Sequence, residues 1–145
     1  MALEPILVIE TSLDDCPPQV AGYVLERALE LGALDAYLIP AQMKKNRPGV
    51  VLTILARPEQ RAAMVGLLLR ETPTLGVRIL ACERETLARK ILRVPTEFGA
   101  IAVKVAGDKA APEYEDCRAA AKRHDVTLRA VQAAAMAAYA LRRKK

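Results

Sequence analysis

Three carboxylates near the beginning of the chain could bind a metal ion: Glu10, Asp14 and Asp15. They lie at the end of a short apolar segment, directly before a predicted helix. Carboxylates at the C-terminal end of a strand are well placed to hold a hard cation such as Mg²⁺ or Mn²⁺, directly or through water. Aspartate is also a favoured helix cap, and capping alone would explain Asp14 or Asp15. Our hypothesis is that all three hold a divalent cation.

A second feature is the basic segment Lys44-Lys45-Asn46-Arg47, which precedes a Pro-Gly turn. Three cations within four residues repel one another unless an anion neutralises them. A phosphate chain suits this segment, because arginine grips oxygens with two parallel hydrogen bonds and lysine acts as a point charge. A solvated surface turn is the alternative. We assign Lys44, Lys45, Asn46 and Arg47 to a phosphate ligand.

Further candidates are spread along the chain. Lys104 alternates with small residues on one face of a predicted strand, which suits either the floor of a ligand site or a plain solvent face. Arg78 follows a loop that contains Thr74 and is similarly ambiguous. Glu113 and Asp116 lie in the first turn of a predicted helix, where acids complement the helix dipole, and either could also bind metal or a ligand hydroxyl. Thr74, Arg78, Lys104 and Glu113 complete the predicted binding residues.

Several site types are excluded. There is no glycine-rich phosphate loop with Lys and Ser/Thr, so the P-loop class is ruled out. One histidine and three scattered cysteines form no zinc pattern and no C-x-x-C pair, which leaves a hard ion held by oxygens. An odd number of distant cysteines also argues against a disulfide scaffold and for a reducing compartment. No acid–base pair can be assigned, so the catalytic residues are unknown.

Composition indicates a folded protein that binds anions. The 145 residues are 52% hydrophobic but only 3% aromatic, so Val, Ile, Leu and Ala must build the core. The net charge of +5 favours anionic partners. With one Phe, four Tyr and no Trp, the chain has few rings on which bases could stack, so we expect no nucleic-acid partner. An apolar run long enough to span a membrane and a secretory leader are both lacking, so we expect a cytoplasmic protein without membrane contact.

These residues need a framework of alternating strands and helices. Apolar runs predict strands near residues 5–11, 33–40, 50–55 and 77–82. Helical spacing predicts one helix that ends near residue 31 and another that begins at Pro58. The resulting βαββαβ order is that of ferredoxin-like α+β folds. Two further strands, near residues 87–94 and 100–105, precede helices over about 112–122 and 127–142. We expect one domain over residues 1–145.

Taken together, the motifs resemble the C-terminal region of the LarC-type nickel insertases. The resemblance lies in five segments: Glu10-Thr11-Ser12-Leu13-Asp14-Asp15, Gly32-Ala33-Leu34-Asp35, Met43-Lys44-Lys45-Asn46-Arg47-Pro48-Gly49, Glu71-Thr72-Pro73-Thr74-Leu75-Gly76-Val77-Arg78 and Pro112-Glu113-Tyr114-Glu115-Asp116. The chain departs from the family pattern at Ser12, where Asn is usual, and at Cys16, where Met is common. Neither departure removes a charged residue named above.

The resemblance implies a lyase-type function that the residues alone do not give. Such proteins insert nickel, as a substrate, into pyridinium bisthiocarboxylate mononucleotide, forming the cofactor of lactate racemase, and they consume CTP with Mn²⁺ or Mg²⁺. The C-terminal region is associated with metal–CTP binding and with homo-oligomer formation, and a longer N-terminal region handles nickel. This chain lacks that region, so we expect it to bind CTP without completing insertion. The alternative is a non-catalytic ferredoxin-like module for small-molecule sensing or oligomerisation.

Overall fold

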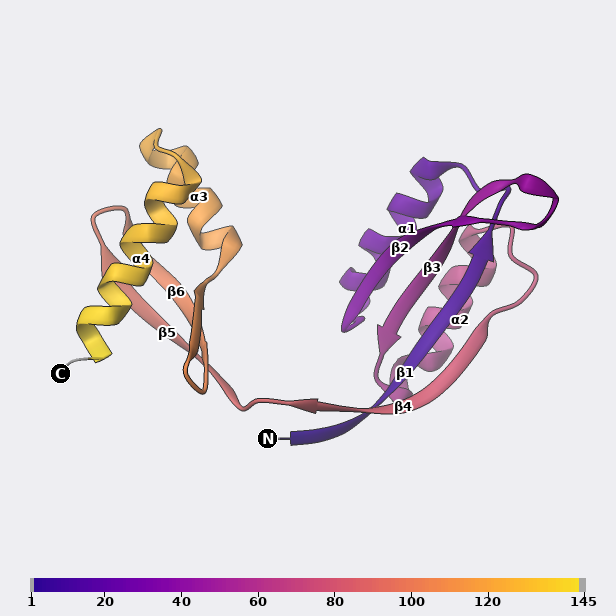
Figure 1. Cartoon of the computed structure of the whole chain (residues 1–145), viewed down its shortest axis with the longest axis horizontal. Helices are drawn as coiled ribbons and strands as arrows, with labels where there is room; N and C mark the ends of the chain where they lie inside the picture. Colours follow the sequence, from indigo (N-terminus) through magenta and orange to yellow (C-terminus); the bar gives the residue numbers. More distant parts are fainter. Residues whose placement is uncertain (1, 144–145) are drawn as a thin grey trace. The chain divides into compact units, whose positions relative to one another are not determined.

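The computed structural model describes residues 2–143 and contains two compact units. The N-terminal unit is Leu3–Glu85, and the C-terminal unit is Thr86–Lys145 together with Met1–Ala2. Each unit is a sheet with two helices (Figure 1). The sequence predicts one domain, whereas the structure has two units because each has its own buried cluster and no residue belongs to both clusters.

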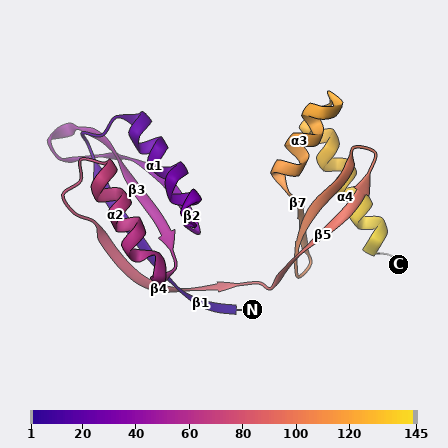
Figure 2. The same cartoon turned by 180° about the vertical axis from the view of Figure 1, so that it is seen from behind.

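The N-terminal unit has the predicted ferredoxin-like architecture. Its sheet has the order β2-β3-β1-β4, with β3 antiparallel to both of its neighbours. The two helices cover one face of this sheet, as the opposite views of Figures 1 and 2 show. Its elements are β1 (Ala2–Leu13), α1 (Pro18–Glu30), β2 (Asp35–Gln42), β3 (Pro48–Ala56), α2 (Arg61–Glu71) and β4 (Arg78–Thr86). The α+β prediction is therefore confirmed.

Alternation along the central strands builds the core of this unit. Ile9 of β1 lies opposite Ile54 of β3, and both are fully buried under the helices. Helix α1 begins with Pro18, whose fixed φ suits a first helical position, and it buries Val24 and Ala28. Short 3₁₀ turns, η1 (Lys44–Asn46) and η2 (Pro58–Gln60), precede β3 and α2. The predicted helix from Pro58 therefore starts as a 3₁₀ turn.

The C-terminal unit is a three-stranded antiparallel sheet in the order β5-β6-β7, packed against two helices. Its elements are β5 (Arg89–Thr96), β6 (Gly99–Ala106), β7 (Lys109–Pro112), α3 (Tyr114–His124) and α4 (Leu128–Arg143). Strand β7 is not predicted from the sequence, because four residues rich in alanine carry no strand signal of their own. Pairing with β6 across the turn at Gly107 (φ +60°) makes them a strand. No helix in residues 2–143 is long and apolar enough to cross a membrane.

Candidate functional site

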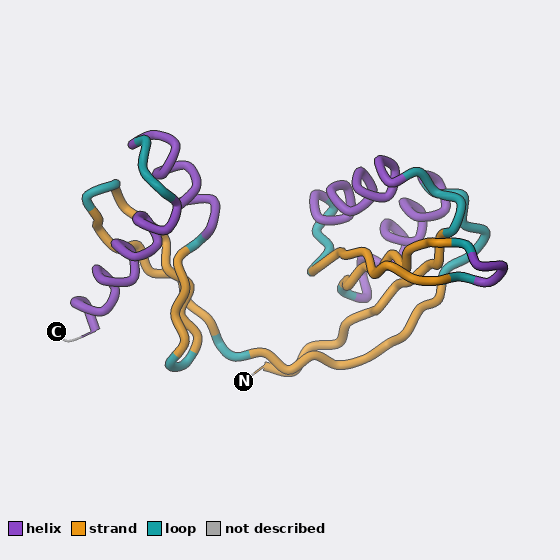
Figure 3. The backbone as a smooth tube through the Cα atoms, turned by 45° about the horizontal axis from the view of Figure 1, so that its top comes forward, coloured by secondary structure: helices purple, strands orange, loops and turns teal. Residues whose placement is uncertain are grey.

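The basic segment forms the turn between β2 and β3 in the N-terminal unit (Figure 3). Lys45 and Asn46 have left-handed backbones, with φ of 60° and 57°. A left-handed backbone costs a residue with a side chain roughly 1–2 kcal/mol, and such strain gathers at functional sites. Met43 N donates to Arg47 O at 2.8 Å and closes the turn. The side chains of all four predicted phosphate-binding residues are exposed around this turn.

Gly49 brings the basic turn against the acidic end of β1. A Cβ atom at this position would lie 2.5 Å from Leu13 O and 2.8 Å from Met43 Cγ, too close for either contact. The same Cβ would lie 3.2 Å from Asp14 Cα. Only glycine therefore allows the β3 backbone to approach the residues that carry the predicted metal-binding carboxylates.

Two arginines face two of these carboxylates at the end of the sheet beside the basic turn. Arg47 Nη1 lies 3.5 Å from Asp14 Oδ2, and Arg78 Nη2 lies 3.7 Å from Glu10 Oε2. Arg78 also donates to Ser12 Oγ at 3.2 Å. Both ion pairs are longer than a direct charge-assisted hydrogen bond, and both arginines are more than half exposed. Pairs of this kind contribute about 0–1 kcal/mol, so a ligand can replace them at little cost.

Threonine hydroxyls form hydrogen bonds at the same end of the sheet. Thr74 Oγ1 lies 2.5 Å from Thr11 Oγ1 and donates to Gly76 O at 2.7 Å. This hydroxyl therefore holds the loop that precedes β4 against β1. Thr53 Oγ1 donates to Glu10 Oε1 at 3.4 Å and so orients that carboxylate. Thr74 is among the residues predicted from the sequence, whereas Thr11 and Thr53 are not. A usable signal was a hydroxyl within each apolar strand run.

The predicted metal-binding residues do not form a ready-made cage. In the described range 2–143, no group of three or more His, Cys, Asp or Glu side chains is placed to hold a metal ion. The oxygen donors of Glu10 and Asp14 still suit Mg²⁺ or Mn²⁺, which keep several waters and need only one or two carboxylates beside substrate phosphates. Asp15 is exposed. The metal-binding role of all three carboxylates remains a prediction.

Cys16 lies directly after these acids. Burial, and next the carboxylate of Asp15, raises the pKa of the Cys16 thiol above its ordinary value. A thiol with a raised pKa stays protonated at neutral pH, and the thiolate is the form that binds metals and attacks electrophiles. We therefore assign no ligand or nucleophile role to Cys16.

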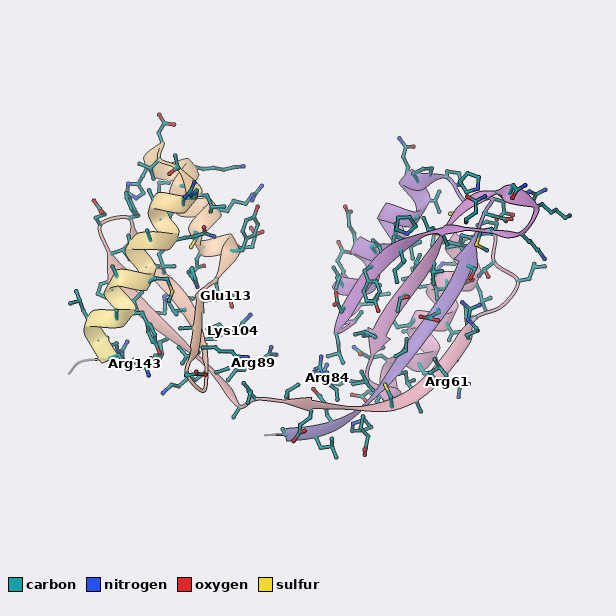
Figure 4. The ribbon with its side chains drawn as sticks, viewed as in Figure 1. Arg61, Arg84, Arg89, Lys104, Glu113 and Arg143 are labelled. Atoms are coloured by element: carbon teal, nitrogen blue, oxygen red, sulfur yellow. The ribbon has the colours of Figure 1, made fainter. Side chains whose placement is uncertain are left out.

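Lys104 and Glu113, the remaining predicted binding residues, lie in the C-terminal unit. Lys104 Nζ is 2.8 Å from Glu113 Oε1, and Figure 4 shows the two side chains next to each other. Asp116, the other first-turn acid, accepts a hydrogen bond from Ala102 N at 2.8 Å and ties α3 to β6. The structure thus brings Lys104 and Glu113 together, in a different unit from the basic turn and the acidic end of β1.

Comparisons with known proteins agree on one family. Residues 1–132 match the family model described as nickel insertion protein. A putative nickel insertion protein of Synechococcus elongatus is 45% identical over 139 residues, which are 92% of this chain and 35% of that protein. The pyridinium-3,5-bisthiocarboxylic acid mononucleotide nickel insertion protein of Acetivibrio thermocellus is 45% identical over 129 residues, or 86% of this chain and 32% of that protein. The chain thus spans about a third of the length of these curated relatives.

Two solved structures share the fold. One is LarC2, the C-terminal domain of a cyclometallase involved in the synthesis of the NPN cofactor of lactate racemase, in its apo form. It superposes with a TM-score of 0.89 at 38% identity and covers 95% of this chain and 99% of that one. A protein of Methanopyrus kandleri, with a TM-score of 0.62 at 23% identity over 95% of this chain and 89% of that one, shares the fold alone.

Proposed function

Because the chain belongs to the nickel insertion protein family, we propose that it is the part of a nickel insertase that binds CTP with a divalent cation. The proposed whole reaction is CTP-dependent insertion of nickel, as substrate, into a pyridinium bisthiocarboxylate mononucleotide, with Mn²⁺ or Mg²⁺. A longer N-terminal part would handle the nickel. The observation that carries the proposal is the contact between the basic turn and the acidic end of β1.

The proposed roles follow from the charges at the end of the sheet beside the basic turn. Lys44, Lys45 and Arg47 would bind the triphosphate, with Asn46 lining the same turn. Arg47 and Arg78 each face a carboxylate at 3.5–3.7 Å. A triphosphate offers these guanidinium groups stronger acceptors, since a bidentate contact with phosphate is shorter and stronger than these pairs. Asp14 and Glu10 would then be free to hold the cation together with Asp15.

The remaining predicted residues have secondary roles in this proposal. Thr74 would shape the loop beside the site, because its hydroxyl is already bound to Thr11 and Gly76 O. Lys104 and Glu113 remain predicted ligand-binding residues, and both belong to the C-terminal unit. Their mutual ion pair is partly exposed, at 46% and 34% of the side chains, so the pair is accessible to a ligand. Homo-oligomer formation and a cytoplasmic location belong to the same proposal.

Calorimetry tests the proposal directly. CTP with Mn²⁺ is titrated into the purified chain, with ATP plus Mn²⁺ and metal-free CTP as comparisons. We expect saturable binding that needs the metal and prefers CTP. Loss of one charge-assisted contact in Lys45→Ala or Arg47→Ala is expected to weaken binding about tenfold or more. Asp14→Asn is expected to weaken the metal-dependent part of the affinity.

Arg61 provides the matched control. It is an exposed arginine of the same unit, on α2, and is labelled in Figure 4. Arg61→Ala removes the same charge as Arg47→Ala and should leave CTP affinity unchanged. Wild-type affinity in all three single variants Lys44→Ala, Lys45→Ala and Arg47→Ala would contradict the assignment of the basic turn.

The rival proposal is an assembly or sensing module without nucleotide chemistry. Exposed apolar side chains on the two edge strands of the N-terminal sheet, Ile39 on β2 (49% exposed) and Leu80 on β4 (60%), favour it, because each offers an apolar contact to a partner at its own edge. If the rival is right, light scattering should show an oligomeric state that responds to an amino acid or similar small molecule. CTP with Mn²⁺ should then change neither the oligomeric state nor the heat of titration.

A further inference from the structure

The basic excess of the protein belongs to the C-terminal part of the chain. Residues 86–145 contain 13 lysines and arginines against 6 aspartates and glutamates, whereas residues 3–85 contain 9 against 11. The proposed CTP site lies in the second of these ranges, so it does not account for the excess. An anionic ligand of the C-terminal unit would account for it.

Four of these cations gather around one cavity. The cavity has a volume of about 610 Å³ and lies between the start of β5 and the end of α4. Its cationic lining residues are Arg89, Lys90, Arg142 and Arg143, and its other described lining residues include no acid. Figure 4 labels Arg89 and Arg143 at the end of the unit away from the α3–α4 turn. A volume of this size is typical of pockets that bind small molecules.

These cations are not neutralised by neighbouring acids. In the part of the chain that the structure describes, none of the four has a carboxylate within 4.0 Å; the ion pairs of this unit involve Arg93, Lys104 and Arg118, and its cations outside the cavity are also partly unpaired. Arg142 Nη1 donates to Arg93 O at 3.1 Å, and this contact leaves its charge unpaired. Asp108 lines an adjoining cavity that shares Tyr139 and Arg143, yet it forms no ion pair within that distance with any residue in the range 2–143.

The helix dipole accounts for only two of the four cations around the cavity. Cations in the last turn of a helix are favoured by its dipole, which accounts for Arg142 and Arg143 at the end of α4. Arg89 and Lys90 come from a different element, the first two positions of β5, where no such dipole acts. Bringing like charges together from two elements is unfavourable unless an anion lies between them.

The rest of the lining suits a planar ring. Leu92, Val105 and Tyr139 provide the apolar part of the cavity, and the Tyr139 ring packs against the buried cluster of the unit. A positively charged ring is attracted to the face of a tyrosine, whereas anionic groups on the same ligand pair with arginine and lysine. The cavity therefore offers cations to phosphate and carboxylate groups and a wall lined by Tyr139, Leu92 and Val105 to an aromatic ring.

We infer that this cavity binds a pyridinium mononucleotide, with its phosphate and acid groups on Arg89, Lys90, Arg142 and Arg143 and its ring against Tyr139. This rests on the proposed function, in which a nucleotide of this class receives nickel. The site is separate from the basic turn between β2 and β3, which is assigned to the triphosphate. The two nucleotides would therefore bind to different units of the chain.

The test uses nicotinic acid mononucleotide as the probe, because it combines a pyridinium ring, a carboxylate and one phosphate. Calorimetry on the whole chain should show saturable binding of this probe without Mn²⁺. We expect Arg143→Gln to weaken binding about tenfold, as one charge-assisted contact is lost, and Lys90→Gln combined with Arg143→Gln to weaken it further. The matched control is Arg129→Gln, since Arg129 is also an exposed arginine of α4 but lies outside the cavity.

Two further arms identify the ligand and separate the two proposals. Ribose 5-phosphate, which lacks the ring, should bind to the wild-type protein less tightly than the probe does. The Tyr139→Leu variant should bind the probe less tightly than the wild-type protein does. Lys45→Ala should lose CTP affinity and keep probe affinity. If wild-type protein binds the probe but not CTP, the proposed CTP site fails and the cavity assignment stands.

Several results would overturn the cavity assignment. These are equal probe affinity in wild type, Arg143→Gln and the double variant; equal affinity for CMP and the probe; or weakening of CTP and probe binding together by the cavity variants. Tight RNA binding that is lost in the double variant would point to a nucleic-acid surface instead and would also overturn it. Far-ultraviolet circular dichroism of each variant confirms that the fold is retained, which is expected because Lys90 and Arg143 are exposed.

Discussion

The two units share an architecture but differ in how they handle charge and core volume. Both are antiparallel sheets with two helices. The N-terminal unit fills its core mainly with Ile, Leu and Met and pairs two of its site cations, Arg47 and Arg78, with acids. The C-terminal unit builds its core from Val, Ala, Ile and Cys, and four cations around its cavity have no ion pair with the residues that the structure describes. In our two proposals, a ligand would therefore replace existing ion pairs in the N-terminal unit and would supply the missing negative charge in the C-terminal unit.

The largest expected effect tests whether the two cores are separate. Ile54 is fully buried in the core of the N-terminal unit, and Ile54→Ala should lower the free energy of unfolding of that unit by about 2–5 kcal/mol through lost burial and a cavity. Because no core residue is shared, urea should expose Cys16 at a lower concentration in this variant and expose Cys117 at the wild-type concentration. Thiol labelling along a urea series measures both.

Leu75→Ala is the control for that experiment. Leu75 is fully exposed, so its truncation should change the free energy of unfolding by less than about 0.5 kcal/mol. If Ile54→Ala advanced the labelling of Cys117 as much as that of Cys16, the description of two independent cores would be wrong.

A smaller effect is expected at the contact between the basic turn and β1. Gly49→Ala would place a Cβ atom 2.5 Å from Leu13 O, a backbone atom that moves only with the strand. We expect a loss of about 1–3 kcal/mol in the free energy of unfolding, together with weaker CTP binding because the turn shifts away from Asp14. Gly66 lies inside α2 with open space around it, so Gly66→Ala should stabilise the protein by about 0.4–1 kcal/mol. Equal effects of the two substitutions would show that the close approach at Gly49 is not needed.

Cys117 gives a pH-dependent test of the C-terminal core. Burial, and next the Asp116 carboxylate, raises the pKa of the Cys117 thiol above its ordinary value of 9.0. A raised folded-state pKa stabilises the protonated form, so this stability is fully present below the unfolded pKa and is lost as pH rises through the higher folded pKa.

The expected result is a labelling rate for Cys117 that stays far below that of Cys82 throughout the range, because the thiol is fully buried and burial favours its protonated form. Stopped-flow labelling from pH 7 to 10 measures this rate, and exposed Cys82 provides the comparison in the same molecule. Prompt labelling of Cys117 at pH 7, at a rate like that of Cys82, would contradict the packing described for α3.

The smallest expected effect concerns the ion pair between Lys104 and Glu113. Both side chains are more than a third exposed, so Glu113→Gln should change the free energy of unfolding by only about 0–1 kcal/mol, and less at high salt. Urea denaturation at low and high salt measures this change. A loss larger than that of Gly49→Ala would show that the C-terminal unit also relies on paired charges, and the contrast between the units would disappear.

The sequence predicted most of the regular structure. Strands with apolar alternation, such as β1 and β3, and helices with clear spacing, such as α1 and α4, were found because the pattern is local. Strand β7 was missed because its pairing with β6 is its only strand signal. Boundaries also shifted: the first strand extends over Ala2–Leu13 rather than residues 5–11.

The candidate site was predicted in part. The basic turn and the acidic end of β1 were both recognised from residue types, but Thr11, Thr53 and the close approach at Gly49 were not. These contacts depend on which strands lie side by side, and Thr53 lies 43 positions from Glu10 in the chain. No local pattern contains that information.

What the sequence by itself determined is the order of elements, the ferredoxin-like class and the charged motifs, because periodicity and turn chemistry act over a few residues. The tertiary structure alone decided that there are two cores, that Arg47 and Arg78 face Asp14 and Glu10, and that four cations from β5 and α4 share a cavity. These features arise from packing between distant segments, in which burial selects the neighbours and each charge then acts on whatever the fold has placed beside it.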